Sequence, residues 1–267
     1  MKKTFAFAAT LLVGLAFAPS VLAQDWAVQN LEKSPRHQEW VQIKHDNRTL
    51  HAFVIYPETK GKATAVVVIH EIFGLSDWAR SAGDQLAAAG YIAIVPDLLS
   101  GFGPNGGRSK DFPSVGAARE ANSNLDPAIV TADLNAAADY VKRLPAANGK
   151  IAVAGFCWGG TQSFRFATTR PDLSAAFVFY GAPPTDFASI KAPVYGFYAG
   201  DDARVSSTVP ATTEGMKQAG KKYEPVIYEG AGHGFMRAGE DPANTNPANK
   251  KARAEAWQRW LALMKTL

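Results

Sequence analysis

The chain reads Lys-Ile-Ala-Val-Ala-Gly-Phe-Cys-Trp-Gly-Gly from Lys150 to Gly160. An apolar run typical of a buried strand is followed at once by the pattern Gly-x-Cys-x-Gly and then by a segment with helical spacing. A strand that turns this sharply into a helix strains its central residue, and flanking glycines remove the Cβ atoms that would clash. The stretch predicts a nucleophile elbow with Cys157 at its tip. A small cysteine packed beneath the turn is the alternative, since free cysteine is often buried.

The first 23 residues predict a secretory signal peptide. Two lysines precede an apolar stretch at 5–17, and small or modest residues follow up to Ala23. The stretch is shorter than the roughly 20 residues that a membrane span requires, so we expect cleavage before Gln24 and no membrane span afterwards. We therefore expect a periplasmic or secreted protein in which residues 24–267 form a single domain.

Composition excludes several classes of function. Lys2 and Lys3 belong to the predicted signal peptide, and their loss lowers the formal charge from +4 to +2. This mild excess, without a Lys/Arg cluster, predicts no nucleic-acid surface. Cys157 is the only cysteine, so the chain cannot form an internal disulfide. There is no Cys/His cluster, and His70-Glu71 lacks the second histidine of an H-E-x-x-H motif, so we expect no metal site.

Strand-like and helix-like segments alternate along the chain. A continuous β-branched run at 63–69 predicts a strand buried on both faces of a parallel sheet, and apolar residues recurring from Val130 to Leu144 predict a helix. The predicted strands are 40–44, 50–56, 63–69, 91–95, 151–154, 175–180, 194–198 and 225–228, and the predicted helices are 76–89, 130–144, 159–169, 209–219 and 249–264. These β-α units predict a doubly wound, mostly parallel sheet with helices on both faces.

Two loops at predicted strand ends carry the partners that a thiol nucleophile requires. Asp202 follows the strand at 194–198, and His233 follows the strand at 225–228. The order of nucleophile, acid and histidine along the chain is the one typical of α/β-hydrolases. His233 would relay the thiol proton, and the aspartate would fix the histidine tautomer. Asp201 competes with Asp202 for this role, and spacing alone does not choose between them.

The loop at 70–74 reads His-Glu-Ile-Phe-Gly and follows the strand at 63–69. In this fold one oxyanion donor comes from that loop and the other from the residue after the nucleophile, so Ile72 and Trp158 are the candidate N–H donors. Ile72 and Phe73 can also form an apolar floor beneath a substrate. Glu71 is a candidate second base or a like charge beside the thiolate, and a surface carboxylate is the alternative.

These motifs together resemble the dienelactone hydrolase family. The resemblance runs from about Leu50 to the C-terminus, and it is carried by 70–74, 96–98, 155–160, 200–205 and 232–237. It implies an α/β-hydrolase fold in which a Cys-His-Asp triad opens enol-lactone or related ester bonds of a small molecule without a cofactor. It also implies that Asp202 is the acid, that Glu71 takes the thiol proton once substrate has displaced it, and that Arg237 binds a substrate carboxylate.

The sequence departs from the family pattern after Pro-Asp-Leu at 96–98, where the family has a second carboxylate-binding arginine. Residues 99–103 read Leu-Ser-Gly-Phe-Gly, and Arg108 or Arg119 could replace that arginine from the longer loop at 99–126. This loop is placed to cover a pocket, and a solvated insertion is the alternative. The predicted export is a second departure, because the family's well-known catabolic enzymes resemble cytoplasmic proteins. A noncatalytic binding protein and a thiol redox protein remain alternatives.

Overall fold

The computed structural model describes residues 24–267, and the predicted signal peptide lies outside them. An eight-stranded sheet runs through the described residues in the order β1-β2-β4-β3-β5-β6-β7-β8. The pairs β1–β2 and β2–β4 are antiparallel, and all other neighbouring strands are parallel. This topology confirms the predicted mostly parallel sheet.

The eight predicted strands and five predicted helices are all present, with small shifts at their ends. The strands are β1 (Gln38–His45), β2 (Arg48–Ile55), β3 (Ala63–Ile69), β4 (Ile92–Asp97), β5 (Ala147–Phe156), β6 (Ala175–Phe179), β7 (Val194–Ala199) and β8 (Tyr223–Tyr228). The predicted helices are α2 (Asp77–Ala88), α4 (Pro127–Lys142), α5 (Trp158–Thr169), α7 (Val209–Gln218) and α9 (Pro247–Met264). Further helices are α1 (Asp25–Glu32), α3 (Val115–Ser123), α6 (Ala203–Ser206) and α8 (Phe235–Ala238), with short 3-10 turns at η1 (Pro104–Gly106) and η2 (Ser109–Asp111).

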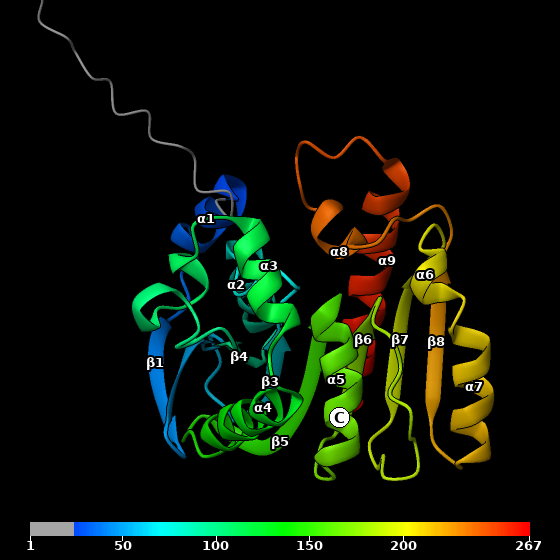
Figure 1. The fold of residues 1–267 in the computed structure, drawn as a ribbon, viewed down its shortest axis with the longest axis horizontal. Coiled ribbons are helices and arrows are strands. Elements are labelled where there is room, and N and C mark those ends of the chain that lie inside the picture. The colour runs from blue at the N-terminus through cyan, green and yellow to red at the C-terminus, as the bar shows by residue number, and fades with distance from the viewer. Residues whose placement is uncertain (1–23) are drawn as a thin grey trace, which may run out of the picture.

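Helices cover both faces of the sheet (Figure 1). Successive side chains of β3 point to opposite faces, as the geometry of a strand requires. Ala65 and Val67 pack in the core that contains apolar residues of α4 and α5, whereas Val66 and Val68 pack in the core that contains residues of α2 and α9. The all-apolar sequence of β3 therefore follows from burial on both sides.

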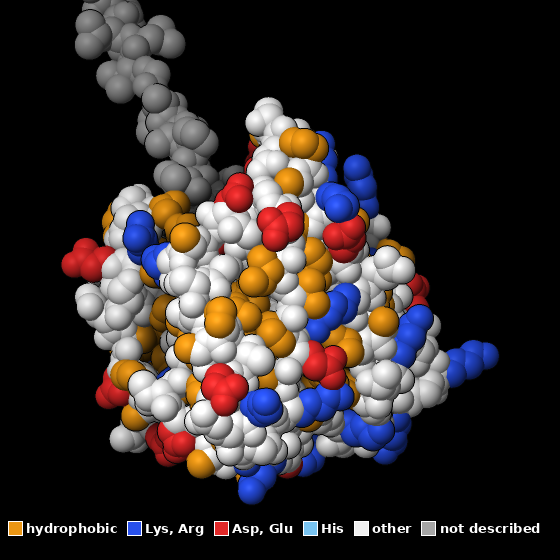
Figure 2. All heavy atoms as spheres, turned by 90° about the vertical axis from the view of Figure 1, so that its right-hand side faces the viewer, with side chains coloured by type: hydrophobic (Ala, Val, Ile, Leu, Met, Phe, Trp, Pro, Cys, Tyr) orange, Lys and Arg blue, Asp and Glu red, His pale blue; other side chains and the backbone are white. Residues whose placement is uncertain are grey.

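β8 forms an edge of the sheet, on the face of the molecule that Figure 2 draws. Val226 and Ile227 are partly exposed there, and apolar side chains alternate with charged ones across this face (Figure 2). Pro225 lacks an N–H group, and Lys222 forms an ion pair with Glu224 at 3.0 Å. Proline and charged side chains are common on edge strands, because they discourage pairing with a second sheet.

The strand register brings the carboxyl ends of the parallel strands together. Ile69 at the end of β3 is opposite Gly155 of β5, and Phe156 is opposite Phe179 at the end of β6. At the ends of β7 and β8, Ala199 is opposite Tyr228. Loops that follow aligned strand ends meet at one edge of the sheet, which is where such folds bind ligands. This edge carries the predicted site residues Glu71, Ile72, Phe73, Cys157, Trp158, Asp202, His233 and Arg237.

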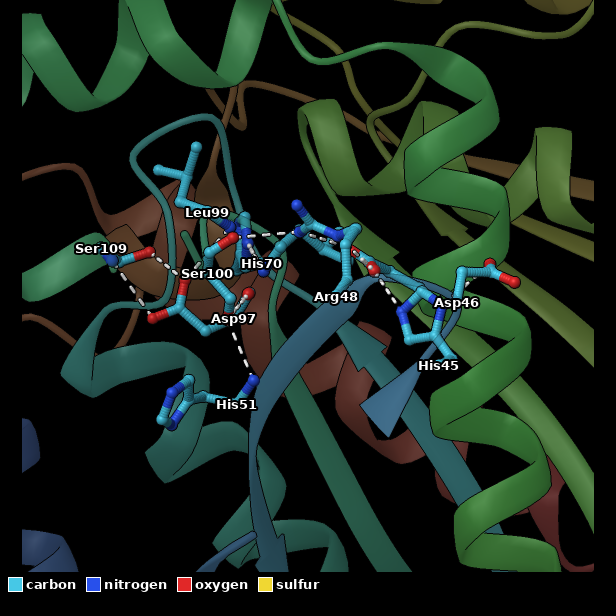
Figure 3. A network of polar contacts seen from close by, with 11 residues as sticks. His45, Asp46, Arg48, His51, His70, Asp97, Leu99, Ser100 and Ser109 are labelled. Carbon is cyan, nitrogen blue, oxygen red and sulfur yellow. Dashed lines mark hydrogen bonds and ion pairs between the residues drawn. The ribbon is translucent and has the colours of Figure 1, made fainter. Parts of the chain in front are cut away.

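The long segment at 99–126 is ordered around a buried carboxylate (Figure 3). Asp97 accepts hydrogen bonds from the Ser109 hydroxyl at 2.5 Å and from the backbone N–H groups of Ser109 and Leu99, each at 3.2 Å. Burial raises the pKa of Asp97 to about 6, and the hydrogen bonds from Ser109 oppose that rise. The segment then forms α3, from which Arg119 reaches the cavity described below. It therefore borders that cavity in part.

Candidate active site

Cys157 lies on a strained turn between β5 and α5. Its φ is 58° and its ψ is −118°, a conformation that is rare for a residue with a side chain. A Cβ at Gly155 would lie 1.9 Å from the carbonyl oxygen of Gly159, and a Cβ at Gly159 would lie 2.4 Å from that of His70. Only glycine fits at both positions, so the Gly-x-Cys-x-Gly pattern is required by the turn itself.

The Cys157 side chain is half-buried and lines a cavity of about 500 Å³. This volume is typical of sites that bind small molecules. Cys157 is therefore not packed beneath the turn, which was the alternative prediction. The cavity is lined by Ile72, Phe73, Arg119, Cys157, Trp158, Thr161, Tyr180, Ala182, Arg204, Val205 and His233.

Asp202, rather than Asp201, is the acid that contacts His233. The distance between Asp202 Oδ2 and His233 Nδ1 is 2.5 Å, and the Asp202 carboxylate is buried. Asp201 is exposed, and its backbone N–H donates to the carbonyl of Ala231 at 2.9 Å, which ties the acid loop to the histidine loop. The two adjacent aspartates therefore have different contacts, since Asp202 is bound to the imidazole and Asp201 helps to close the turn.

The glycine-rich loop that carries His233 is fixed by two neighbours. The N–H of Gly232 donates to Asn249 Oδ1 at 2.9 Å, and the ring of Tyr180 meets the His233 ring edge-on at a centroid distance of 5.0 Å. Burial lowers the pKa of His233, but interactions with Cys157 and Asp202 outweigh burial and raise that pKa above its usual value. Because Nδ1 faces Asp202, Nε2 is the ring nitrogen left for the thiol.

Arg237 is bound to Glu71 in this structure. The distance from Arg237 Nε to Glu71 Oε2 is 2.6 Å, and the Glu71 side chain is only 4% exposed. Burial lowers the pKa of Arg237, but the charge of Glu71 outweighs it and raises that pKa above its usual value. Neither side chain lines the cavity, although the Arg237 guanidinium lies 5.7 Å from the centroid of the Phe73 ring. The predicted substrate-binding arginine is therefore already paired.

The two predicted oxyanion donors, Ile72 and Trp158, both line the cavity beside Cys157. The N–H of Gly74 donates to the Glu71 carbonyl at 3.2 Å, which closes a turn with Ile72 in its middle. Among residues 24–267 the Ile72 N–H has no hydrogen-bond acceptor. Trp158 is the first residue of α5, where backbone N–H groups have no partner within the helix.

Of the two arginines predicted as replacements for the missing one, the structure places Arg119 at the cavity. Arg108 lies elsewhere, with its guanidinium 4.2 Å from the centroid of the Trp40 ring. Arg204 also lines the cavity, and sequence reasoning missed it. In the part of the chain that the structure describes, neither Arg119 nor Arg204 forms an ion pair.

Tyr180 is a second residue that sequence reasoning missed. It follows β6 directly, has a φ of 40°, and is buried, with no hydrogen-bond partner for its hydroxyl within residues 24–267. Burial and the nearby charge of Glu71 raise the pKa of Tyr180 well above its usual value. Its position at the carboxyl end of a predicted strand is the signal that could have found it.

No group of three or more histidine, cysteine or acidic side chains in residues 24–267 is placed to hold a metal ion. Among the described helices, none combines the length and apolar character needed to cross a bilayer.

The mostly parallel sheet, with a strained strand-to-helix turn where a central strand ends, defines an α/β-hydrolase fold. The chain belongs to the dienelactone hydrolase family, whose family model matches residues 50–267. It is accordingly a hydrolase of the carboxylic ester and lactone class.

Relatives of known name and structure support the same assignment. A Salmonella typhi protein named "Putative carboxymethylenebutenolidase" is 32% identical over 216 residues, which cover 75% of this chain and 76% of the relative. A Bradyrhizobium protein named "Probable 2-oxo-3-(5-oxofuran-2-ylidene)propanoate lactonase" is 30% identical over 74% of this chain and 83% of its own length. The crystal structure of a "Putative Dienelactone Hydrolase" from Klebsiella pneumoniae has a TM-score of 0.75 and 26% identity, covering 87% of this chain and 99% of its own.

Proposed function

We propose that this protein hydrolyses a lactone or ester bond of a small anionic molecule, with Cys157 as the nucleophile. One observation carries the proposal. Cys157 projects from a strained turn into the same cavity as His233, and Asp202 holds the far nitrogen of that histidine at 2.5 Å. This is the arrangement of a nucleophile, a base and an orienting acid. The names of the relatives above favour a lactone.

In the first half of the reaction, the Cys157 sulfur attacks the carbonyl carbon, and the thiol proton passes to His233 Nε2. Negative charge then develops on the carbonyl oxygen. The free N–H groups of Ile72 and Trp158 donate to it, and such preorganised donors supply a large part of the rate enhancement in acyl transfer. The C–O bond breaks, and the leaving oxygen takes the proton from His233. In a lactone this oxygen stays attached to the acyl chain.

In the second half, water attacks the thioester carbonyl and gives a proton to His233. The C–S bond breaks, the acid product leaves, and Cys157 regains a proton. Asp202 stabilises the charged imidazolium that forms in both halves, as in other triads. No cofactor is required by these steps.

Glu71 has a conditional role in this proposal. Its carboxylate is buried and held by Arg237, so it can accept the Cys157 proton only after that ion pair opens. A substrate anion that approaches Arg237 would compete with Glu71 for the guanidinium. Binding of substrate would thereby free Glu71 to take the thiol proton before it passes to His233, and an unoccupied site would keep Cys157 protonated and less open to oxidation.

The charge of the substrate is assigned from the two arginines that line the cavity without an ion pair, Arg119 and Arg204. Arg119 comes from α3 and Arg204 from α6, so they approach from separate elements. Phe73, whose ring also lines the cavity, supplies an apolar surface beneath the substrate. A guanidinium binds a carboxylate through two parallel hydrogen bonds, which favours an anionic ligand.

Replacing Arg204 or Arg119 by glutamine is expected to change selectivity between substrates. We expect each variant to lower kcat/KM about tenfold for an aryl ester that carries a carboxylate, the scale of one charged hydrogen bond, and less than twofold for its neutral analogue. The measurement is the ratio of the two kcat/KM values. Arg108→Gln is the matched control, because Arg108 stacks on Trp40 away from the cavity. Equal losses with both esters would remove the proposed role.

The proposed function is tested by the thiol dependence of hydrolysis. The purified chain from Gln24 onward is assayed with a small aryl ester and with a dienelactone, before and after treatment with iodoacetamide. Because Cys157 is the only cysteine, alkylation has a single target. We expect turnover that alkylation abolishes. Turnover that survives alkylation would indicate another nucleophile, and oxidation of Cys157 without any turnover would favour the redox alternative.

Export of the protein is also a proposal, and it rests on the lysines, apolar stretch and small residues of 1–23. Mass spectrometry of the protein purified from its native cells is expected to find a chain that begins at Gln24. A chain that retains Lys2 and Lys3 would contradict export by this route.

A further inference from the structure

His70 is a fully buried histidine that the reaction described above does not use. It lies between the end of β3 and the loop at 71–74, and its side chain has no exposure to solvent. Figure 3 shows it in the polar network that also contains Asp97 and Ser109. A buried polar side chain is costly unless its groups are hydrogen-bonded, so both ring nitrogens of His70 require partners.

The two ring nitrogens of His70 have different partners. Nδ1 lies 2.7 Å from the carbonyl oxygen of Glu71, and Nε2 lies 3.3 Å from the backbone N–H of Leu98. A carbonyl can only accept and a backbone N–H can only donate, so Nδ1 carries the hydrogen and Nε2 does not. Burial lowers the pKa of His70 to about 4, which keeps the ring neutral and this tautomer fixed at neutral pH.

The bond to Glu71 acts on the peptide group that contains the Ile72 N–H. In a trans peptide the C=O and N–H groups lie in one plane and point in opposite directions, and residues 24–267 contain no cis peptide bond. The Glu71 carbonyl accepts from His70 Nδ1–H at 2.7 Å and from the Gly74 N–H at 3.2 Å, and the Ile72 N–H of the same peptide must point the other way. The Ile72 N–H has no hydrogen-bond acceptor in the described residues, and Ile72 lines the cavity.

His70 also contacts the residue that carries the second donor. Its ring stacks on the indole of Trp158 at a centroid distance of 5.8 Å and an interplanar angle of 13°. In addition, the carbonyl oxygen of His70 lies against Gly159, where a Cβ would approach it to 2.4 Å. One buried residue therefore contacts the loop at 71–74, the first turn of α5 and, through Leu98, the end of β4.

We propose that His70 is a positioning residue, which aims the Ile72 N–H into the cavity by holding the opposite side of its peptide plane and keeps that donor in register with Trp158. This inference rests on the proposed oxyanion role of these two N–H groups. It assigns His70 no contact with the substrate.

Three substitutions distinguish the effect of the hydrogen bond from His70 to the Glu71 carbonyl from the effect of side-chain volume. His70→Asn places an amide N–H near the position of Nδ1 and keeps the donor to Glu71. His70→Gln places its amide near Nε2 and keeps the partner of Leu98, whereas His70→Leu keeps neither. The matched control is His51→Leu, because the His51 ring makes no hydrogen bond to the described residues and only its backbone N–H joins the network (Figure 3).

We expect His70→Leu and His70→Gln to lower kcat for an aryl ester about thirtyfold, with KM changed less than threefold, because loss of one oxyanion donor costs on the order of a hundredfold. His70→Asn should stay within about fivefold of the wild type. The rate of Cys157 alkylation by iodoacetamide needs no oxyanion donor, so it should change less than twofold in every variant. A merely structural role would instead slow alkylation and lower the melting temperature in parallel with turnover.

A second readout does not depend on turnover. Benzaldehyde forms a hemithioacetal with Cys157, in which the sulfur bonds to the carbonyl carbon and the thiol proton ends on the oxygen, and its affinity is measured as protection from iodoacetamide. We expect weaker protection in His70→Leu and His70→Gln than in His70→Asn. Equal protection in all three variants, or equal kcat for Asn and Gln, would overturn the inference. If the wild type binds the aldehyde but cleaves no ester, the proposed function fails while this order of protection still decides the role of His70.

Discussion

Replacing Cys157 by alanine is expected to lower kcat/KM for an aryl ester by at least about 10⁴-fold, the loss that follows removal of a triad nucleophile. The reason is specific to this chain. No other cysteine exists, and Cys157 is the residue that the strained turn presents to the cavity. The measurement is the initial rate with each protein, corrected for hydrolysis in buffer alone.

Cys157→Ser is the matched control for this substitution. Oxygen keeps the position of the nucleophile, but a hydroxyl is far harder to deprotonate than a thiol, so it depends more heavily on the base. We expect serine to restore a small part of the activity that alanine loses. A loss of less than about tenfold in Cys157→Ala would show that catalysis does not pass through this residue.

Replacing His233 by alanine is expected to lower kcat at least about a hundredfold, the scale of a lost general base. His233 is held by Asp202 at 2.5 Å and interacts with Cys157, so its loss removes the group that moves the proton in both halves of the reaction. Added imidazole should recover part of the loss, because it can diffuse into the space that the ring occupied. Rates are measured with the same ester and with excess substrate.

His37→Ala is the control for the histidine substitution, since the side chain of His37 is 68% exposed and lies outside the cavity. We expect it to behave as the wild type. A change of less than fivefold in His233→Ala would contradict the role of base. An unchanged rate in Asp202→Asn would contradict the orienting role of the acid.

Much of the site follows from the sequence because each residue is tied to a local constraint. Gly155 and Gly159 are required by a turn with no room for a Cβ at either position. Their spacing therefore identifies Cys157 as the residue at the tip of that turn. The register of the parallel strands then brings the loops of Asp202 and His233 to that turn, and strand order along the chain is enough to predict this.

Other features depend on contacts between distant segments, which spacing does not encode. The pairing of Glu71 with Arg237 joins residues 166 positions apart, so a sequence pattern could suggest a role for each but not their contact. α3 is only 9 residues long and follows a glycine-rich stretch, and this short segment hid both the helix and the position of Arg119. The tautomer of His70 follows only from the two hydrogen-bond partners of its ring, which lie on other parts of the backbone.

The chemical identity of the acylated residue tests the account most directly. The protein is mixed with an aryl ester whose acyl group leaves slowly, quenched with acid during turnover, digested and analysed by mass spectrometry. We predict an added acyl mass on the peptide that contains Cys157, which appears within the first turnover and disappears as substrate is consumed. Continued turnover with this peptide unmodified, or an acyl group found on another residue, would contradict the account.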